Sequence, residues 1–241
     1  MQAFTSAGFV AASVARSQTV SSSPVKIPAG ILASALFVLI ALPLAAAGLE
    51  PTLGKKGKLL LDEKFEGDAV PKGWNKNTGV LTAAGGALHA SELASEKHVG
   101  AFRKLMPLQD CAIQLDVKFA GATTFHLGFD PAPGELKKKG HLFSLVLTPE
   151  SWSITEHVDK DDPKSKNVIH AKVATKFARD QWVTLLLEVK GDTVVVSAEG
   201  RAPLRAMAKD FHVKKPGLVF RVGGKDGQGV QIDNVKVWAL E

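Results

Sequence analysis

Apolar and polar residues alternate with a period of two along most of the chain after residue 58, and no segment sustains the period of an amphipathic helix. The segment Ala112–Phe119 is the clearest case, because its Ile, Leu, Val and Phe side chains fall on one face and its Gln, Asp and Lys side chains on the other. Such alternation is typical of antiparallel strands that are buried on one face. The pattern therefore predicts an all-β protein.

Clusters of Gly, Pro, Asp and Lys separate the alternating segments and mark the turns between strands. After an opening strand, the predicted strands are Gly79–Leu81, Ala87–Ala90, Val99–Leu105, Ala112–Phe119, Thr123–Phe129, His141–Thr148, Trp152–Val158, Asn167–Val173, Trp182–Val189, Thr193–Ala198, Leu218–Val222 and Val230–Leu240. Two further segments, Ala174–Asp180 and Arg205–Asp210, are compatible with short helical turns.

The chain opens and closes with strand-like segments, Leu59–Gly67 and Val230–Leu240. Two such ends can pair with each other, which favours one closed sandwich of two antiparallel sheets over two separate domains. The segments His141–Thr148 and Thr184–Val189 carry apolar residues on both faces. Since strands of this kind are buried on both sides, we expect loops to cover part of one sheet.

An apolar segment near the N-terminus, Ile31–Leu44, follows the positive charge of Lys26 and ends in the small residues Ala45–Gly48. This arrangement is typical of a secretory signal peptide cleaved after Ala47. The alternative is an uncleaved anchor, because residues 27–49 are about long enough to span a bilayer, which takes about 20 residues. Either way we expect a bacterial periplasmic, secreted or outer-envelope protein. The predicted parts are a signal peptide or N-terminal anchor (1–47), a short linker (48–58) and a β-sandwich domain (59–241).

The charge and cysteine content exclude some classes of function. The formal net charge is +6, and lysine clusters such as Lys137–Lys139 lie beside Gly or Pro without interleaved aromatic residues. Nucleic acid is therefore not an expected partner, and membrane contact is expected only through the N-terminal segment if it is not cleaved. Cys111 is the only cysteine, so no internal disulfide can form. It falls on the apolar phase of its strand, which predicts a buried, unreactive thiol.

Four segments together resemble a known group of domains. They are LDEKFEG near the start, with Gly73-Trp74 soon after, then CAIQLDVKF, DQWVTLLLEVKGDTVVV and the closing VQIDNVKVWAL. They resemble concanavalin A-like jelly-roll domains of exported bacterial proteins, in particular the 3-keto-disaccharide hydrolase family, also described as family 16 glycoside hydrolase-like. The resemblance implies a jelly-roll β-sandwich with a concave groove that faces carbohydrate. The family 16 signature Glu-x-Asp-x-x-Glu is absent from this chain.

Three titratable residues are candidate catalytic groups. Asp116 and His126 fall on the outward phase of neighbouring predicted strands, and Glu156 lies in the following hairpin. On a concave face such groups could act as acid and base, whereas on a convex face they would be solvated polar residues. Hydrolysis by paired carboxylates needs two carboxyl groups about 5 Å or about 6.5–9.5 Å apart, and the sequence locates no such pair.

Four further residues are candidate ligand-binding groups, namely Asp130, Trp152, His157 and Trp182. Tryptophan rings can pack on the apolar face of a sugar, and Asp and His can bind its hydroxyl groups. Trp152 also shares the phase of Ile154, which favours a place in the core instead.

A structural calcium ion that joins the first strand to the last is a further hypothesis. Asp62 or Glu66 from the opening strand and Asp233 from the closing strand could supply the hard oxygen ligands that Ca²⁺ prefers, together with backbone carbonyls. The alternative is a β-bulge at Asp233-Asn234, which would let both Ile232 and Val235 face inward despite their odd spacing.

The sequence thus predicts an exported β-sandwich that binds carbohydrate or an envelope glycan on its concave sheet. One alternative is a glycoside-cleaving enzyme of the 3-keto-disaccharide hydrolase type, and a second is a structural envelope protein. An enzyme requires titratable groups that converge in one groove, whereas a binding module can lack them.

Overall fold

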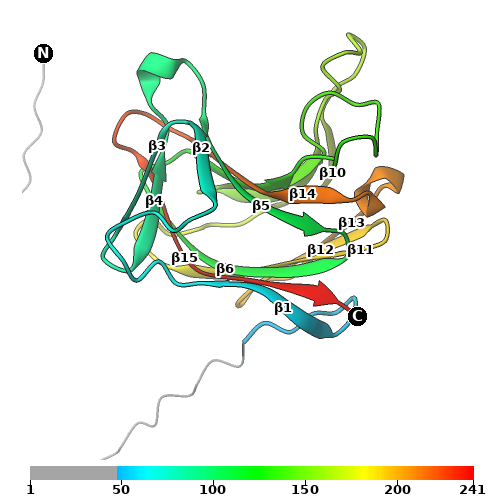
Figure 1. Ribbon diagram of the computed structural model, residues 1–241, viewed down its shortest axis with the longest axis horizontal. Coiled ribbons are helices and arrows are strands. Elements are labelled where there is room, and N and C mark those ends of the chain that lie inside the picture. The colour runs from blue at the N-terminus through cyan, green and yellow to red at the C-terminus, as the bar shows by residue number, and fades with distance from the viewer. Residues whose placement is uncertain (1–47) are drawn as a thin grey trace, which may run out of the picture. The chain divides into compact units, whose positions relative to one another are not determined.

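The computed structural model describes residues 48–241, and the predicted signal peptide or anchor, residues 1–47, lies outside the described residues (Figure 1). The described chain is all-β, with two short 3₁₀ helices, η1 (Ala94–Glu96) and η2 (Lys209–His212), and no α-helix. Within the described residues no helix is long and apolar enough to cross a membrane. The predicted fold class is therefore confirmed.

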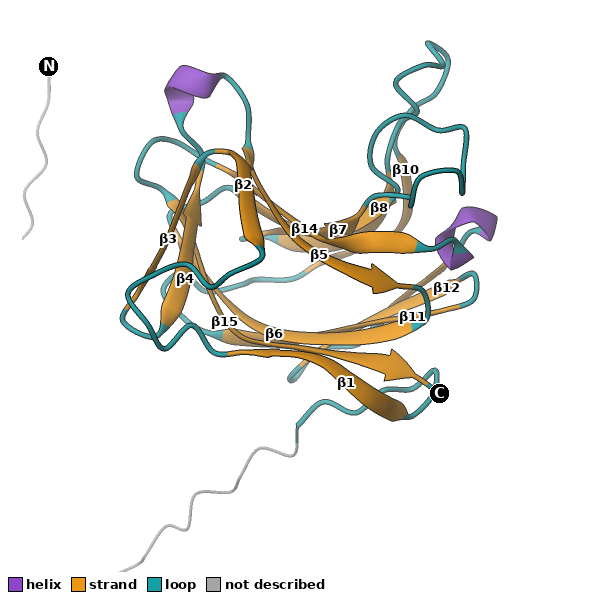
Figure 2. Cartoon of the chain, viewed as in Figure 1, coloured by secondary structure: helices purple, strands orange, loops and turns teal. Residues whose placement is uncertain are grey.

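Two antiparallel sheets pack face to face (Figure 2). The eight-stranded sheet has the order β13 (Leu204–Met207), β12 (Thr193–Ala198), β11 (Val183–Lys190), β6 (Cys111–Ala120), β15 (Gly229–Leu240), β4 (Ala87–Ser91) and β3 (Val80–Ala84), with β1 (Lys56–Glu63) also paired to β15. The seven-stranded sheet has the order β10 (Val168–Ala174), β9 (Ser151–Glu156), β8 (Phe143–Thr148), β7 (Thr124–Phe129), β14 (Lys215–Gly223), β5 (Gly100–Leu108) and β2 (Trp74–Thr78).

The first and last strands pair, as the sequence predicts. β4 pairs with β15 up to Ile232, and β1 pairs with it from Val235 onward. Between these two partners the register shifts, Asn234 takes a left-handed backbone conformation with φ 51°, and Ile232 and Val235 are both fully buried. The predicted β-bulge is thus present, and it marks the point where β15 exchanges one neighbour for the other.

The core fills the space between the sheets with the inward phases of both. Phe102, Phe125 and Phe220 from the seven-stranded sheet, and Leu115 and Ile113 from the eight-stranded sheet, are fully buried. Burial of each such side chain contributes about 1.5–3 kcal/mol. Cys111 also lies in this core, and burial raises the pKa of its thiol to about 12, so the prediction of a buried thiol is confirmed.

The outer face of the eight-stranded sheet is partly covered by the segment that precedes β1. Leu49 and Leu53, with Trp238, pack against a buried cluster of Ala112, Leu186 and Leu240. The buried side chain of Glu188 accepts hydrogen bonds from the backbone N–H groups of residues 52 and 53, both at 2.7 Å. Leu186, the apolar residue on the outer face of β11, is buried beneath this segment. The segment predicted as a linker, residues 48–58, therefore packs on the sheet and runs into β1.

Two strands are absent from the sequence prediction, and neither predicted helical turn forms over its predicted residues. β2 is largely polar and buries mainly Trp74, so its sequence lacks an apolar alternation. Residues 204–207 form strand β13 at the sheet edge and only residues 209–212 turn into a 3₁₀ helix, whereas a helical turn was predicted for Arg205–Asp210. The second predicted turn, Ala174–Asp180, contains no helix.

Candidate functional site

The outer face of the seven-stranded sheet is concave and carries the candidate site. The sheet is curved, and loops rise on both sides of this face (Figure 2). The face, called the groove floor below, holds a pocket of about 260 Å³. Its lining residues are Asn77, Thr78, His98, Ala101, Arg103, Asp130, Gly140, His141 and Lys160. The groove is thus polar and is lined by groups that donate hydrogen bonds.

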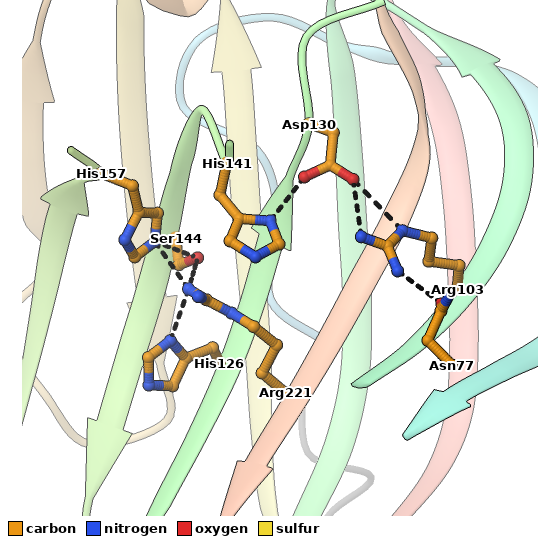
Figure 3. A network of polar contacts seen from close by, with 8 residues as sticks. All are labelled: Asn77, Arg103, His126, Asp130, His141, Ser144, His157 and Arg221. Carbon is orange, nitrogen blue, oxygen red and sulfur yellow. Dashed lines mark hydrogen bonds and ion pairs between the residues drawn. The ribbon is translucent and has the colours of Figure 1, made fainter. Parts of the chain in front are cut away.

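Arg221 is the centre of a network of polar side chains on the groove floor (Figure 3). It lies on the outward phase of β14, because its neighbours Phe220 and Val222 point into the core. Its Nη2 atom lies 2.8 Å from His126 Nδ1 and 2.7 Å from His157 Nε2. Since arginine only donates hydrogen bonds, both ring nitrogens are acceptors. Each neutral ring therefore carries its proton on the other nitrogen.

Ser144 completes this part of the network. Its Oγ lies 3.0 Å from Arg221 Nη2 and 2.8 Å from His157 Nε2, so the hydroxyl can accept from the arginine and donate to the histidine. Nη2 has two N–H groups for its three neighbours, so its hydrogen bonds are shared among His126, His157 and Ser144. Gly128, directly opposite Ser144 on β7, makes room for this side chain, because a Cβ atom at Gly128 would overlap the Ser144 hydroxyl. The reason for a glycine at this position is therefore the close approach of the Ser144 side chain, since the backbone of Gly128 is not in the left-handed region.

A second group of contacts surrounds Asp130, which follows β7. Its Oδ1 accepts a hydrogen bond of 2.6 Å from His141 Nδ1, and its Oδ2 accepts bonds of 3.2 and 3.1 Å from Arg103 Nε and Nη2. Arg103 also donates to Asn77. Burial favours the neutral carboxyl, but the hydrogen bonds and charges of His141 and Arg103 outweigh it and lower the pKa of Asp130. Asp130 is thus an ionised acceptor that orients His141.

The two histidines beside Arg221 are neutral at physiological pH. Burial, followed by the positive charge of Arg221 and then that of His141, lowers the pKa of His126 to about 3. The same causes lower the pKa of His157 to about 3. Burial also lowers the pKa of Arg221, to about 10, so its guanidinium stays charged at neutral pH. Two neutral rings and one buried cation therefore share this part of the floor.

The structure brings three of the predicted site residues together on the groove floor. His126, Asp130 and His157 all belong to the network in Figure 3. Sequence reasoning did not find Arg103, Arg221, His141 or Ser144. A signal for Arg221 was present, because it is a charged residue at the centre of the apolar run Leu-Val-Phe-Arg-Val.

The predicted catalytic residues do not form one site. Asp116 lies on β6 in the eight-stranded sheet and bonds to Thr184 at 2.6 Å on that sheet, whereas His126 lies in the other sheet. The two strands follow each other along the chain, but the connection through Gly121 crosses between the sheets. Glu156 ends β9, between β10 and β8, on the phase of Trp152 and Ile154 that faces away from the groove.

Local ion pairs hold Glu156. Its carboxylate lies 3.5 Å from Lys138 Nζ and 3.0 Å from His170 Nε2.

The two tryptophans predicted to bind a ligand lie outside the groove. Trp152 is 1% exposed in the core, in agreement with the core alternative, so its ring cannot reach a ligand. Trp182 is 45% exposed, but it lies beside β11 in the eight-stranded sheet under Lys118.

The residues named for calcium do not assemble into a side-chain site. Asp62 lies opposite Lys236 in the register of β1 and β15, and both Asp233 carboxylate oxygens bond to Asn234. Burial, and the nearby charges of Asp116 and Glu66, raise the pKa of Asp233. Nevertheless, residues 48–241 contain no group of three or more His, Cys, Asp or Glu side chains placed to hold a metal ion. These side chains alone do not fit Ca²⁺, and ligation through backbone carbonyls stays a prediction.

No family model matches the sequence, and no curated protein does. Solved structures nevertheless share the fold. The carbohydrate binding module CBM66 from Bacillus subtilis is 12% identical, with a TM-score of 0.55 over 69% of this chain and 95% of that one. The family GH16 endo-β-1,3(4)-glucanase SCLam is 15% identical, with a TM-score of 0.58 over 80% of this chain and 96% of that one. A Bacillus subtilis protein of unknown function with a galectin-like fold is 14% identical, with a TM-score of 0.53 over 77% of this chain and 98% of that one.

These likenesses define the class of protein. The two antiparallel sheets, the paired chain ends and the curved seven-stranded sheet make residues 48–241 a concanavalin A-like jelly-roll domain. The predicted resemblance is therefore confirmed at the level of the fold.

Proposed function

We propose that the protein binds a glycan in the groove of the seven-stranded sheet. The observation that carries the proposal is the floor of the groove, where Arg103, Arg221, Asp130 and His141 present hydrogen-bonding groups beside a pocket of about 260 Å³. A sugar ring carries many hydroxyl groups, each of which can both donate and accept. A carbohydrate binding module and a glucanase of the same fold support the assignment.

The test is a comparison of glycan retention between the protein and a variant with a filled pocket. Ala101 lines the pocket and is 6% exposed, so Ala101→Leu places a larger side chain on the floor. Thr82→Leu, at an exposed position on β3 of the other sheet, is the matched control. We expect immobilised polysaccharides to retain the protein and Thr82→Leu, and to retain Ala101→Leu more weakly. Equal retention of all three would place binding outside the groove.

A catalytic role is the second candidate, favoured by the 2.6 Å hydrogen bond between Asp130 Oδ1 and His141 Nδ1. This bond orients the ring and leaves Nε2 without a hydrogen-bond partner in residues 48–241, so the neutral form of His141 would present Nε2 as a general base. Cleavage by two carboxyl groups is not favoured, because Asp130 is held ionised by Arg103 and Glu156 faces the other way. Reducing sugar should be measured in the retention assay. Release that is lost in His141→Ala would establish an enzyme, and retention without release would establish a binding module.

We also propose that the domain acts outside the cytoplasm, because residues 31–48 have the composition of a signal peptide. Mass spectrometry of the protein isolated from its host tests this assignment. A mature chain that begins at Gly48 is expected, and a chain that retains residues 1–47 would indicate an anchor or no export.

A further inference from the structure

One charge on the groove floor is without a carboxylate partner. Asp130 faces Arg103 and His141, and none of the ion pairs among residues 48–241 includes Arg221. The hydrogen-bond partners of Arg221 are two neutral rings and one hydroxyl. A partly buried cation is normally accompanied by an acid, because removal of a charge from water is costly. The charge of Asp130 favours the charged guanidinium from a distance but forms no ion pair with it, so Arg221 has no carboxylate contact within residues 48–241.

The guanidinium also keeps free donors. All three of its contacts are made by Nη2, whereas Nε and Nη1 make no hydrogen bond to the described part of the chain. Neither atom is among the fully buried polar atoms without a partner. Neither atom is therefore fully enclosed by the protein. Nη1 can donate to an oxygen atom of an anionic group, and Nε lies on the other edge of the planar guanidinium, so the two donors would meet separate acceptors.

The surroundings extend the positive character of the floor. Ala101, the register partner of Arg221 on β5, lines the pocket, so the pocket begins one strand away from Arg221. Lys160 lines the pocket from one of the loops above the sheet and forms no ion pair within residues 48–241. A ligand that bridges Arg221 and the pocket would thus meet a second positive charge.

We propose that the ligand is an acidic glycan and that Arg221 binds its acidic group, a uronate carboxylate or a sulfate ester, with Lys160 as a second contact. This inference rests on the proposed glycan binding and narrows it to a charged class. A purely structural role for Arg221 would use Nη2 alone and would leave Nε and Nη1 without partners.

Titration calorimetry with matched pairs of polysaccharides tests the inference. Polygalacturonate and its fully methyl-esterified form share a backbone and differ in the carboxylate charge, and κ-carrageenan and its desulfated form differ in the sulfate. We expect each acidic member to bind at least about tenfold more tightly than its neutral partner, which corresponds to one charged hydrogen-bonding contact. The pair of polysaccharides with the larger difference in affinity identifies the acidic group, carboxylate or sulfate, that the protein prefers. Arg221→Gln should remove that preference.

Arg205→Gln is the control for net charge. Arg205 is exposed on β13 of the other sheet, and its loss lowers the charge of the chain by the same amount. The inference is supported when Arg205→Gln retains the preference and Arg221→Gln does not. It is overturned when both variants weaken binding equally, which would indicate a general effect of charge, or when Arg221→Gln binds as the unsubstituted protein does.

The outcome also separates this inference from the proposed function. Equal binding of acidic and neutral polysaccharides would overturn the acidic class and leave glycan binding in place, whereas binding of none of the four would argue against both. If Arg221→Gln fails to fold, as judged by circular dichroism, Lys160→Gln provides the second test. Lys160 lies in a loop at the pocket, so its substitution should lower affinity for the acidic member about threefold or more without loss of structure.

Discussion

Acidification should destabilise this domain through His126 and His157. Both rings are neutral in the folded protein, with pKa values of about 3, whereas an unfolded chain has a histidine pKa of about 6.5. As the pH falls below about 6.5, the unfolded chain binds protons that the folded chain does not. At pH 5 each ring therefore lowers the free energy of unfolding by about 2 kcal/mol relative to pH 7. Because both rings contact Arg221, about 4 kcal/mol is the upper limit for the pair.

Urea denaturation at pH 7, 6 and 5, followed by tryptophan fluorescence, measures this loss. The control is the double variant His126→Gln/His157→Gln, in which amide oxygens can still accept from Arg221 but nothing titrates. We expect the double variant to be less stable at pH 7 and to have a flatter pH dependence. The reasoning would be refuted if both proteins lost the same free energy between pH 7 and pH 5. The interval ends above the range in which Asp130 protonates, so its carboxylate does not contribute.

Three other predictions follow from contacts outside this pair. Glu188→Ala removes the acceptors for residues 52 and 53 and should cost about 2–4 kcal/mol in urea denaturation, with faster tryptic cleavage near residue 56; equal cleavage would contradict the anchoring role. Gly128→Ala should cost about 1–3 kcal/mol by displacement of Ser144, and Ser144→Ala in the same chain should restore part of that loss if the overlap is its cause. The melting temperature should be the same in EDTA and in millimolar calcium, because no side-chain metal site is assembled; a rise of several degrees with calcium would instead support the hypothesis built on Asp233.

The fold could be predicted from the sequence because the signal for each strand is local. In Cys111–Ala120 the inward residues are apolar and the outward residues polar, so the strand and its buried face follow from the alternation alone. Edge strands lack this signal, since only one side of them is paired and few of their residues are buried. β2 was missed for this reason, and part of β13 was assigned to a helical turn.

The site could be predicted only in part, because it depends on which strands are neighbours. Arg221 reaches His126 because β14 lies between β5 and β7, with Arg221 directly opposite His126 on one side and Ala101 on the other. These three residues are far apart in the sequence, and no local pattern specifies their register. The prediction instead joined His126 to Asp116, its neighbour along the chain, which the crossing at Gly121 places on the other sheet.

A more useful sequence signal is a charged residue on the outward phase of a strand, with apolar residues on either side of it. Arg221 fits this description, because it stands between Leu218–Phe220 and Val222, and Val219 on the same face is 2% exposed. On a solvated face, many polar residues could occupy the position of Arg221. On the floor of a groove, a partly buried charge is costly, so we expect it to contact a ligand. Within residues 48–241 the guanidinium forms no ion pair, since Asp130 acts on it only from a distance, and we therefore infer that an acidic group of the ligand contacts it.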